Sequence, residues 1–563
     1  MNTEILGLIV LFIATLLLSL PLGRYIAHVY DGQPTFLDPI FRPLENAVFR
    51  ISGIRPIDGW SWQRNLAALL IINFIWFLLG MAVLMNMDWL PLNPDGNPGQ
   101  SAHLAFNTTV SFLVNCNLQH YSGESGLSYL GQFYLMFLQF TTAATGMAAA
   151  AILFRALRKG SHNQLGNFFS DFLKTCTRIL LPICLVLSVV FMLSGMPMTL
   201  EGKQTLTSLQ GDSMQVSTGP VAGFVAIKHL GTNGGGFFGV NSAHPLENPS
   251  YFTALVQMVA QMIIPFAMVF AMGYFLKRRK LSWVIFGVMT VGFLALAIPN
   301  IVLESNGNPA VAAMGIHPNA PNMEGKEVRF GPALSGYWSI ATTVISTGSV
   351  NAMHDSFMPI SGMNMLLAMM VNCFYGGVGV GVLNYFIFII LAVFISGLMV
   401  GRTPEFLGKK IEAREMKIAM IVALLHPLLI LAGTALAAAM PSVTGPTLAN
   451  PGFHGFSEML YEYTSSAANN GSGFEGLGDN TPWWNISTGI VLLLSRYLPI
   501  IGPVAIAGLL GSKKYVPESS GTLPTDTVTF GVMTLAVIVL VAALSFFPAL
   551  TLGPIAEHFS LLH

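Results

Sequence analysis

Four short clusters of Gly, Asn, Ser and Thr are the residues of this chain whose types and spacing could do chemistry. Each cluster follows a stretch of helix length in a long loop that carries little charge. Glycine permits backbone dihedrals that turn carbonyl groups inward, and a ring of such carbonyls can replace the water shell of a dehydrating monovalent cation. We therefore predict an ion-binding filter made of Val114, Asn115, Cys116, Asn117, Thr232, Asn233, Gly234, Ser346, Thr347, Gly348, Asn469, Asn470 and Gly471.

The four clusters align in matching frames, which place Cys116, Gly234, Gly348 and Gly471 at the third position. A single cluster of this composition is more often an ordinary turn than a binding site, because turns use the same residues. Four clusters in one chain favour the filter over four unrelated turns. No catalytic residue and no metal other than the bound cation is predicted.

The composition excludes a soluble enzyme. Of the 563 residues, 53% are hydrophobic and only 9% are charged, whereas a soluble domain carries roughly 25% charged residues. Lys plus Arg and Asp plus Glu both number 26, so no basic excess indicates nucleic-acid binding. The four cysteines lack the CxxC spacing of a zinc site and do not suggest a disulfide framework.

Ten apolar stretches are long enough to cross a membrane. Their ends are uncertain by several residues, because hydropathy alone does not place helix termini. The predicted spans are 5–22, 66–87, 129–154, 179–196, 252–276, 284–303, 380–400, 419–440, 485–511 and 529–551.

The basic residues predict the orientation of these spans. Lys and Arg accumulate in loops on the cytoplasmic side, and here every second loop is basic. Clusters within 24–64, 155–178, 277–280, 402–417 and 513–514 bring 21 of the 26 cations to one face. We therefore expect both termini on the outer side.

The clusters, short helices and spans form a unit that occurs four times: a span, a short helix, a polar extended loop and a second span. Internal repeats of this kind decide an architecture. We predict an all-α polytopic protein of about ten transmembrane helices, with four such helix–pore-loop–helix units around a central pore for a monovalent cation and one extra helix at each end. The expected divisions are an N-terminal span and loop at 1–64, repeats at 65–160, 170–280, 281–402 and 403–514, and a C-terminal span at 525–563.

One of the ten spans is expected to be interrupted. Residues 361–375 are apolar but too short to cross comfortably, and a glycine-rich segment follows them. Two separate spans would put the basic cluster at 402–417 on the outer face, so 361–400 is interpreted as one broken span. Broken helices at membrane depth usually line a cavity. We predict a gate at Gly376, Gly377, Gly379 and Gly381; a plain kink or a close helix crossing remains the alternative.

Arg496 lies near the middle of the ninth span, where a cation costs about 2.5–3.5 kcal/mol on insertion scales. It therefore needs a partner or a cavity. We expect its charge to limit or steer the ion in an inner vestibule, and a structural pairing with a carbonyl or an acid is the alternative.

Several long strings resemble the KdpA family, the potassium-binding and translocating subunits of bacterial Kdp P-type ATPases. They are LGTNGGGFF at 230–238, HPLENP at 244–249, NMEGKE at 322–327, AMHDSF at 352–357, GRTPEFLGKK at 401–410 and SSGTLPT at 519–525. The resemblance runs nearly end to end and implies a fold of four channel-like repeats. It also supplies K⁺ as the ion, which the residues alone do not.

The resemblance implies a subunit of an ATP-driven K⁺ uptake system in the bacterial inner membrane. In such a system KdpB hydrolyses ATP, and KdpC and KdpF complete the assembly. The chain agrees with this division, since it has neither a DKTG phosphorylation string nor a GxxxxGK phosphate loop. No covalently bound cofactor is expected. A stand-alone K⁺ channel or transporter driven by the membrane potential is the alternative.

The resemblance and the polar character of four residues near the clusters suggest that these residues support the filter: Gln119, Asn241, His354 and Asp355. A catalytic pair formed by His354 and Asp355 would need further converging groups, such as HExxH or a nucleophile elbow, and the chain has neither.

The first cluster and the residue at 372 depart from the family pattern. Cys116 and Leu118 stand where other members carry Thr and Trp, and Asn372 stands where a glutamate is expected. An acidic gate residue, if the family uses one, is therefore missing from this chain.

Overall fold

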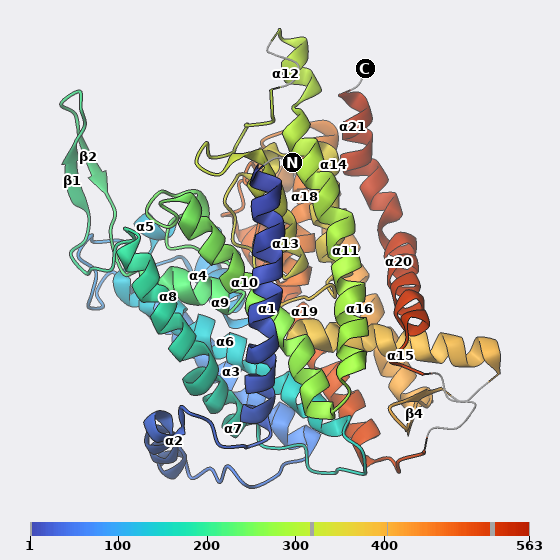
Figure 1. Ribbon diagram of the computed structural model, residues 1–563. Helices are drawn as coiled ribbons and strands as arrows, with labels where there is room; N and C mark the ends of the chain where they lie inside the picture. The colour runs from blue at the N-terminus through green and yellow to red at the C-terminus, as the bar shows by residue number, and fades with distance from the viewer. Residues whose placement is uncertain (1–2, 316–319, 402–403, 518–523, 562–563) are drawn as a thin grey trace.

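The computed structural model describes residues 3–315, 320–401, 404–517 and 524–561; Arg402 and the first five residues of the string at 519–525 lie outside these ranges. The chain forms an elongated bundle of helices (Figure 1). Both termini lie toward one end. Helix α2 (Asp38–Ser52) and the hairpin of β3 (Glu405–Phe406) and β4 (Lys409–Lys410) lie at the other end, called here the basic end.

Ten helices are long and apolar enough to cross a membrane, as predicted. Their sequences are rich in Leu, Ile, Val and Phe, and many of these side chains are exposed where lipid would cover them. The ten are α1 (Thr3–Tyr30), α3 (Trp62–Leu84), α6 (Tyr129–Ala156), α7 to α8 (Phe168–Lys174, then η1 Thr175–Leu180 and Leu181–Leu193), α10 (Tyr251–Leu276), α11 (Arg279–Asn306), α15 (Val380–Val400), α16 (Ala413–Ala438), α19 (Pro482–Ser512) and α20 (Val528–Leu550).

The fourth helix begins at Phe168, well before the predicted residue 179. The extension contains Lys174 and Arg178, which interrupt the apolar pattern but not the helix. Between α7 and α8 the helix contains a π-helical stretch, η1. Arg178 is only 7% exposed because the carboxylate of Glu45 pairs with it. The predicted span began too late because the ion pair allows a charged residue inside the helix, which hydropathy alone does not anticipate.

Four short helices alternate with the long ones and do not cross the bundle. Each lies between the first and the second helix of one unit, which confirms the predicted four-unit architecture; in the third unit the second helix is the interrupted one. They are α4 (Ala102–Leu113) between α3 and α6, α9 (Val221–Leu230) between α8 and α10, α13 (Gly331–Val344) between α11 and α14 (Pro359–Val371), and α18 (Gly452–Ala468) between α16 and α19.

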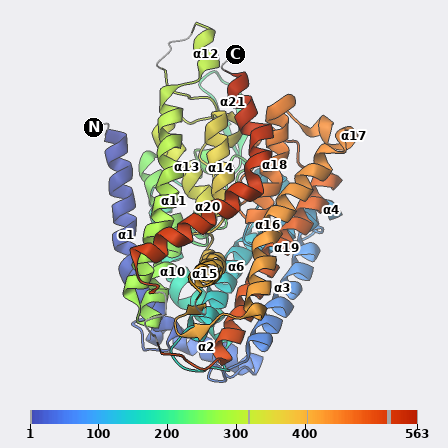
Figure 2. The same cartoon turned by 90° about the vertical axis from the view of Figure 1, so that its right-hand side faces the viewer.

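The predicted interruption of the third unit's second helix is present. Helix α14 ends at Val371, and α15 begins at Val380. Helix α15 does not continue in the direction of α14. It runs across the direction of α1 and α11 in Figure 1 and is seen end-on in Figure 2. The connecting segment therefore turns the chain sideways beneath the short helices.

The two extra helices flank the four units. Helix α1 packs along α10, where Phe12 contacts Phe266 edge-on at 5.6 Å between ring centroids. Helix α20 packs against α11, α14 and α15 and continues through η5 (Thr551–Ile555) into α21 (Ala556–Ser560). The remaining elements lie in loops: α5 (Gly123–Gly126), β1 (Gln204–Thr207), β2 (Ser213–Val216), η2 (Asn241–Ala243), α12 (Pro309–Ala313), η3 (His354–Ser356), α17 (Pro441–Thr444) and η4 (Gly445–Thr447).

Candidate functional site

The four polar clusters leave the C-termini of the four short helices in the same way. In each, a backbone N–H donates to the carbonyl five residues earlier in the helix. The donors and acceptors are Cys116 to Ser111 (3.0 Å), Asn233 to Lys228 (2.8 Å), Thr347 to Thr342 (2.9 Å) and Asn470 to Ser465 (2.9 Å). These bonds fix a common register for the four segments.

Each segment then alternates between ordinary and left-handed backbone. The residues before and after the one whose N–H donates both have positive φ. This alternation of backbone conformation lets neighbouring carbonyls face the same side. The φ values are 62° and 57° at Asn115 and Asn117, 47° and 88° at Thr232 and Gly234, 54° and 84° at Ser346 and Gly348, and 52° and 104° at Asn469 and Gly471.

This register corrects the alignment that the sequence suggested for the first cluster. Cys116 occupies the second position, with Asn233, Thr347 and Asn470, and not the third. Asn117 stands where the other three segments have glycine. Asparagine fits there because it tolerates left-handed dihedrals better than most residues. The sequence alignment failed because α4 ends at Leu113, so Asn117, and not Cys116, lies four residues beyond its helix, as Gly234 and Gly348 do.

The four segments, numbered one to four in chain order (115–117, 232–234, 346–348 and 469–471), follow one another around a ring. A Cβ atom on Gly234 would lie 1.7 Å from the carbonyl oxygen of Thr347, and one on Gly348 would lie 2.2 Å from that of Asn470. A Cβ atom on Gly471 would lie 2.1 Å from the carbonyl oxygen of Cys116. Segments two, three, four and one are thus in successive contact at distances that only glycine allows.

Asn115 closes the ring between the first and second segments. Its Nδ2 donates to the carbonyls of Gly231 and Thr232 at 3.1 and 3.0 Å. Its Oδ1 accepts from the amide of Asn233 at 2.6 Å and from the hydroxyl of Thr142 at 3.0 Å. Three of these hydrogen bonds join the first segment to the second segment and the glycine before it, and the fourth joins it to α6.

Two of the four predicted support residues, Gln119 and Asn241, contact the second segment or the glycines that follow it. Gln119 accepts from the N–H of Gly236 at 2.8 Å and donates to the same residue's carbonyl at 3.0 Å. Asn241 donates to the carbonyl of Gly234 at 2.6 Å, and its Oδ1 accepts from the buried ammonium of Lys228. Both side chains therefore position the second segment.

His354 and Asp355 bind different partners and form no catalytic pair with each other among the described contacts. His354 Nδ1 lies 2.9 Å from the hydroxyl of Tyr461, which is 2.8 Å from that of Ser472. Ser472 in turn donates to the side chain of Asn470. This chain of bonds connects the loop after the third segment to the fourth segment.

Buried ion pairs lie behind the ring. Lys228 Nζ and Glu247 are 2.5 Å apart and fully buried, as are Lys326 and Glu304 at 2.8 Å. No carboxylate belongs to the ring segments themselves. The negative potential at the ring therefore comes from carbonyl oxygens and the C-terminal ends of four short helices.

The predicted gate segment lies directly below the ring, between α14 and α15. The N–H of Gly376 donates to the carbonyl of Val344 at 3.2 Å, and that of Val378 donates to the hydroxyl of Thr232 at 3.0 Å. Gly377 lies near Thr232 and Ile345, whereas Gly379 and Gly381 form close backbone approaches to Gly146 and Tyr375. The gate segment is therefore bonded to the second ring segment and to the end of α13, the short helix of the third unit.

Asn372 was not predicted as a site residue, although it was noted as a departure. It accepts a hydrogen bond from the Ser346 hydroxyl at 2.9 Å and donates to the carbonyl of Ala468 at 3.3 Å. Its carbonyl accepts from Asn384 at 3.0 Å. Only its position after α14 could have indicated this role, because its partners lie far away in the sequence.

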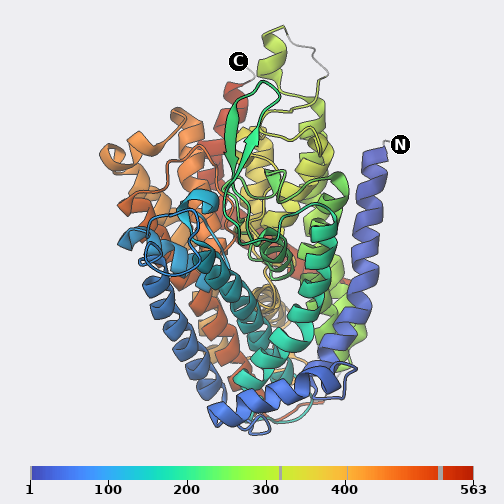
Figure 3. The same cartoon turned by 90° about the vertical axis from the view of Figure 1, so that its left-hand side faces the viewer.

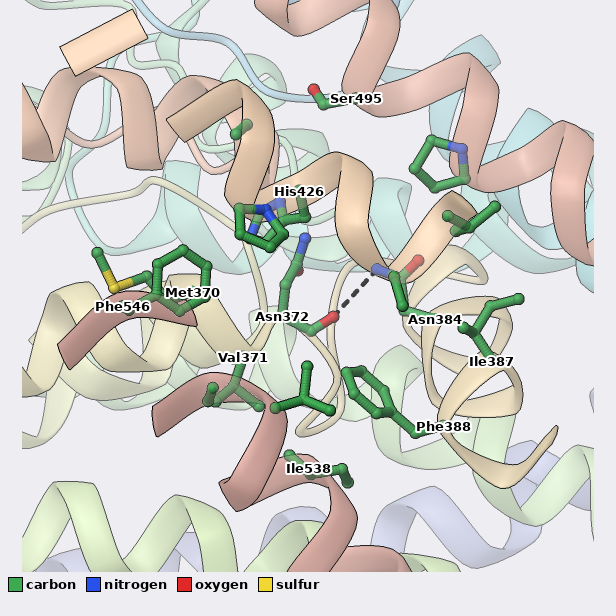
Figure 4. Close-up of a pocket in the computed structure, with 17 residues that line it drawn as sticks. Met370, Val371, Asn372, Asn384, Ile387, Phe388, His426, Ser495, Ile538 and Phe546 are labelled. Carbon is green, nitrogen blue, oxygen red and sulfur yellow. Dashed lines mark hydrogen bonds between the residues drawn. The ribbon is translucent and has the colours of Figure 1, made fainter. Parts of the chain in front are cut away.

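Cavities lie on both sides of the ring. The one toward the termini is about 800 Å³ and reaches Gly348, Gly471 and Gln119. The other is about 60 Å³, is mostly apolar and lies where α14, α15, α16, α19 and α20 meet (Figure 4). Its polar lining consists of Asn372, Asn384, His426 and Ser495.

Arg496 lies in α19 near the ring and is 4% exposed. Its Nη2 atom has no hydrogen-bond partner among the described residues. A Cβ atom on Gly146 would lie 3.3 Å from that nitrogen, next to the backbone of Val378. The guanidinium is therefore beside the gate segment and not paired with an acid in the described part of the chain.

Comparisons with known proteins identify relatives over the whole chain. A sequence model described as KdpA, the potassium-transporting ATPase A subunit, matches residues 9–559. Potassium-transporting ATPase potassium-binding subunits are 66% identical in Flavobacterium johnsoniae, 58% in Phocaeicola vulgatus and 49% in Alicyclobacillus acidocaldarius. The first two alignments cover 100% of both chains, and the third covers 99% of both.

A solved structure has a similar fold. The crystal structure of the potassium transporter TrkH from Vibrio parahaemolyticus has a TM-score of 0.52 and 16% sequence identity. The match covers 89% of this chain and 98% of that one. This likeness supports the fold of the chain.

Proposed function

Because the chain belongs to the KdpA family of potassium-transporting ATPase A subunits, we propose that its ring of four segments is the filter that selects K⁺ for an ATP-driven uptake complex. The chain is a potassium-binding transport subunit and not the ATP-hydrolysing subunit of that complex. The ring register, with a left-handed residue on both sides of each central residue, is the observation that carries the assignment.

The geometry suits K⁺ for two reasons. Carbonyl oxygens from four segments can replace the water that K⁺ must shed, and this exchange needs no full negative charge. The buried side chain of Asn117 also has no hydrogen-bond partner among the described residues for either its Oδ1 or its Nδ2. Its oxygen is thus available to the ion or to the ion's remaining water.

We infer that K⁺ enters from the larger cavity and leaves past the gate segment. Gly376, Gly377, Gly379 and Gly381 would let this segment move, and Arg496 beside it would repel cations and so limit or steer their passage. The smaller cavity at Asn372 begins a route toward the side of the bundle (Figure 4). Along such a route the ion would reach a partner subunit that couples its passage to ATP.

The same inference extends to the other subunits of the complex. The partner that hydrolyses ATP would be KdpB, and KdpC and KdpF would complete the complex. The chain is a multi-pass membrane protein. We place it in the bacterial inner membrane with the basic end in the cytoplasm and both termini outside, since most cations gather at the basic end.

The test compares two glycine substitutions in the complex purified with the tagged chain. Gly234→Asp forces a side chain into the Thr347 carbonyl and adds a charge. Gly211→Asp is the matched control, because Gly211 also has positive φ but no atom lies within 4 Å of its Cβ position. Orthovanadate-sensitive ATP hydrolysis is then measured as a function of K⁺ concentration.

We expect Gly234→Asp to abolish or strongly weaken the K⁺ dependence and Gly211→Asp to preserve it. Normal high-affinity stimulation in Gly234→Asp would show that the ring is not the filter. If no ATPase purifies with the chain and the reconstituted chain alone conducts K⁺, the protein is a stand-alone channel.

A further inference from the structure

Helix α2 lies across the bottom of the bundle at the basic end, in blue in Figure 3. It follows the end of α1 after a short loop and ends at Gly53, whose φ of 67° permits a left-handed cap. Its residues divide into three faces with different chemistry. This division gives the helix a fixed orientation relative to the bundle.

The first face is anchored to the bundle. Glu45 is 2% exposed and accepts hydrogen bonds from Arg178 Nε and the hydroxyl of Thr177, both at 2.7 Å. Asp38, two turns earlier, accepts from Arg178 Nη1 at 2.6 Å. Phe49, one turn after Glu45, is also buried. These contacts prevent the helix from rotating about its axis.

The second face is apolar and uncovered. Ile40, Leu44, Val48 and Ile51 recur at the spacing of one helical stripe and are 66%, 52%, 40% and 87% exposed. Phe36 and Ile57, in the flanking loops, are 78% and 92% exposed. A continuous apolar surface of this kind marks an interaction site.

The third face is basic and also exposed. Arg42 and Arg50 lie on it, and Arg55 follows the helix. None of the three forms an ion pair within the ranges that the structure describes. A helix with an apolar stripe beside exposed arginines has the features of helices that lie in a membrane interface.

We propose that α2 lies in the cytoplasmic leaflet interface and binds anionic phospholipids. Its apolar stripe enters the region of the acyl chains, and Arg42, Arg50 and Arg55 contact the headgroups. The arginines favour a lipid leaflet over a protein partner, because an anionic membrane surface attracts basic residues that lie close to it. The position of α2 at the ends of the transmembrane helices places the stripe at the right depth.

The anchoring contacts give this lipid site a consequence for the bundle. Arg178, which holds Glu45 and Asp38, belongs to the π-helical stretch of the second unit. The hydroxyl of Tyr25, near the end of α1, donates to the carbonyl of the same Arg178 at 3.1 Å. The leaflet is thus connected through α2 to two transmembrane helices.

The first test measures depth in the membrane. A bimane label is attached at Leu44→Cys, or at Asn46→Cys on the exposed polar side as the control, and the purified complex is reconstituted with brominated phosphatidylcholine. The unsubstituted complex corrects for labelling of native cysteines. We expect quenching to be at least about twofold stronger at position 44 than at position 46. Retained K⁺-stimulated ATPase activity shows that both variants are folded.

The second test measures the lipid charge that the arginines recognise. Phosphatidylglycerol added to the brominated vesicles is expected to increase quenching at position 44, and Arg42→Gln with Arg50→Gln is expected to remove this increase. Equal quenching at positions 44 and 46 would overturn the proposal. So would quenching at position 44 that appears only after the partner subunits are removed, because a protein would then cover the stripe.

Discussion

Gly471 contacts Cys116 so closely that a Cβ atom on Gly471 would lie 2.1 Å from the Cys116 carbonyl oxygen. The fourth ring segment therefore packs directly on the first, although more than 350 residues separate them. The contact turns four similar loops into one closed site. A side chain in place of the glycine in the second, third or fourth segment would therefore collide with a carbonyl group of the next segment.

We therefore expect Gly471→Ala to weaken K⁺ binding by at least about tenfold, since overpacking by a single group costs about 1–3 kcal/mol. The matched control is Gly452→Ala in the same unit. Gly452 has a φ of 70° but no atom within 4 Å of its Cβ position, so it reports left-handed strain alone. The measurement is the K⁺ concentration that half-maximally stimulates ATP hydrolysis. Equal effects of the two substitutions would mean that strain, and not the carbonyl contact, explains the loss.

Substitutions at Asn117 test whether the backbone conformation or the side chain at this position matters for K⁺ stimulation. It holds the left-handed position that glycine holds in the other three segments, with φ of 57°. Left-handed backbone costs an ordinary residue roughly 1–2 kcal/mol. We expect Asn117→Ala to weaken K⁺ stimulation by roughly five- to thirtyfold and Asn117→Gly to weaken it less. If Asn117→Gly weakened K⁺ stimulation as strongly as Asn117→Ala, the lost side-chain amide, and not the left-handed backbone, would explain both losses.

The sequence predicted the parts of this fold that depend on local composition. The ten spans and the four short helices are visible because each carries its own apolar run or its own polar cluster. The start of the fourth span was missed because Arg178 is compensated by Glu45, a residue far away in the chain. Such pairing leaves no local signal.

The site was predictable in its composition but not in its register. The glycines at 234, 348 and 471 led to an alignment of Cys116 with them, yet Asn117 takes the glycine position. The contacts of Asn372 with Ser346 and Ala468 were also invisible, because they join residues that lie far apart in the sequence and belong to the third and fourth units. A single sequence contains the residue types but not these long-range contacts.

His454 provides a pH-dependent contact on the side of the larger cavity. Its Nε2 donates to Asp355 at 2.8 Å and its Nδ1 to Glu557 at 2.7 Å, and Glu458 lies nearby. Burial alone would lower the pKa of His454, but these two carboxylates outweigh it and raise the pKa from 6.5 to about 10. The folded protein therefore holds this proton more tightly than the unfolded chain does.

A raised pKa stabilises the fold fully below the unfolded value of 6.5, and the contribution is lost as the pH rises toward about 10. We expect His454→Gln to lower the thermal unfolding temperature most below about pH 6.5 and progressively less up to about pH 10. The measurement is thermal unfolding of the purified complex across this pH range. A difference in unfolding temperature that stays constant with pH would show that the packing of the His454 imidazole, and not its charge, matters at this position.

The last prediction concerns the charge beside the gate segment. Arg496 is buried, and its Nη2 atom has no described hydrogen-bond partner, so its main effect on a passing cation is repulsion. We expect Arg496→Met to change both the K⁺ affinity and the leak of K⁺ through the complex, whereas Arg496→Lys keeps the charge and changes them less. The measurements are K⁺-stimulated ATP hydrolysis and K⁺ flux in vesicles without ATP. If Arg496→Met leaves both unchanged while the protein folds normally, the arginine has only a structural role.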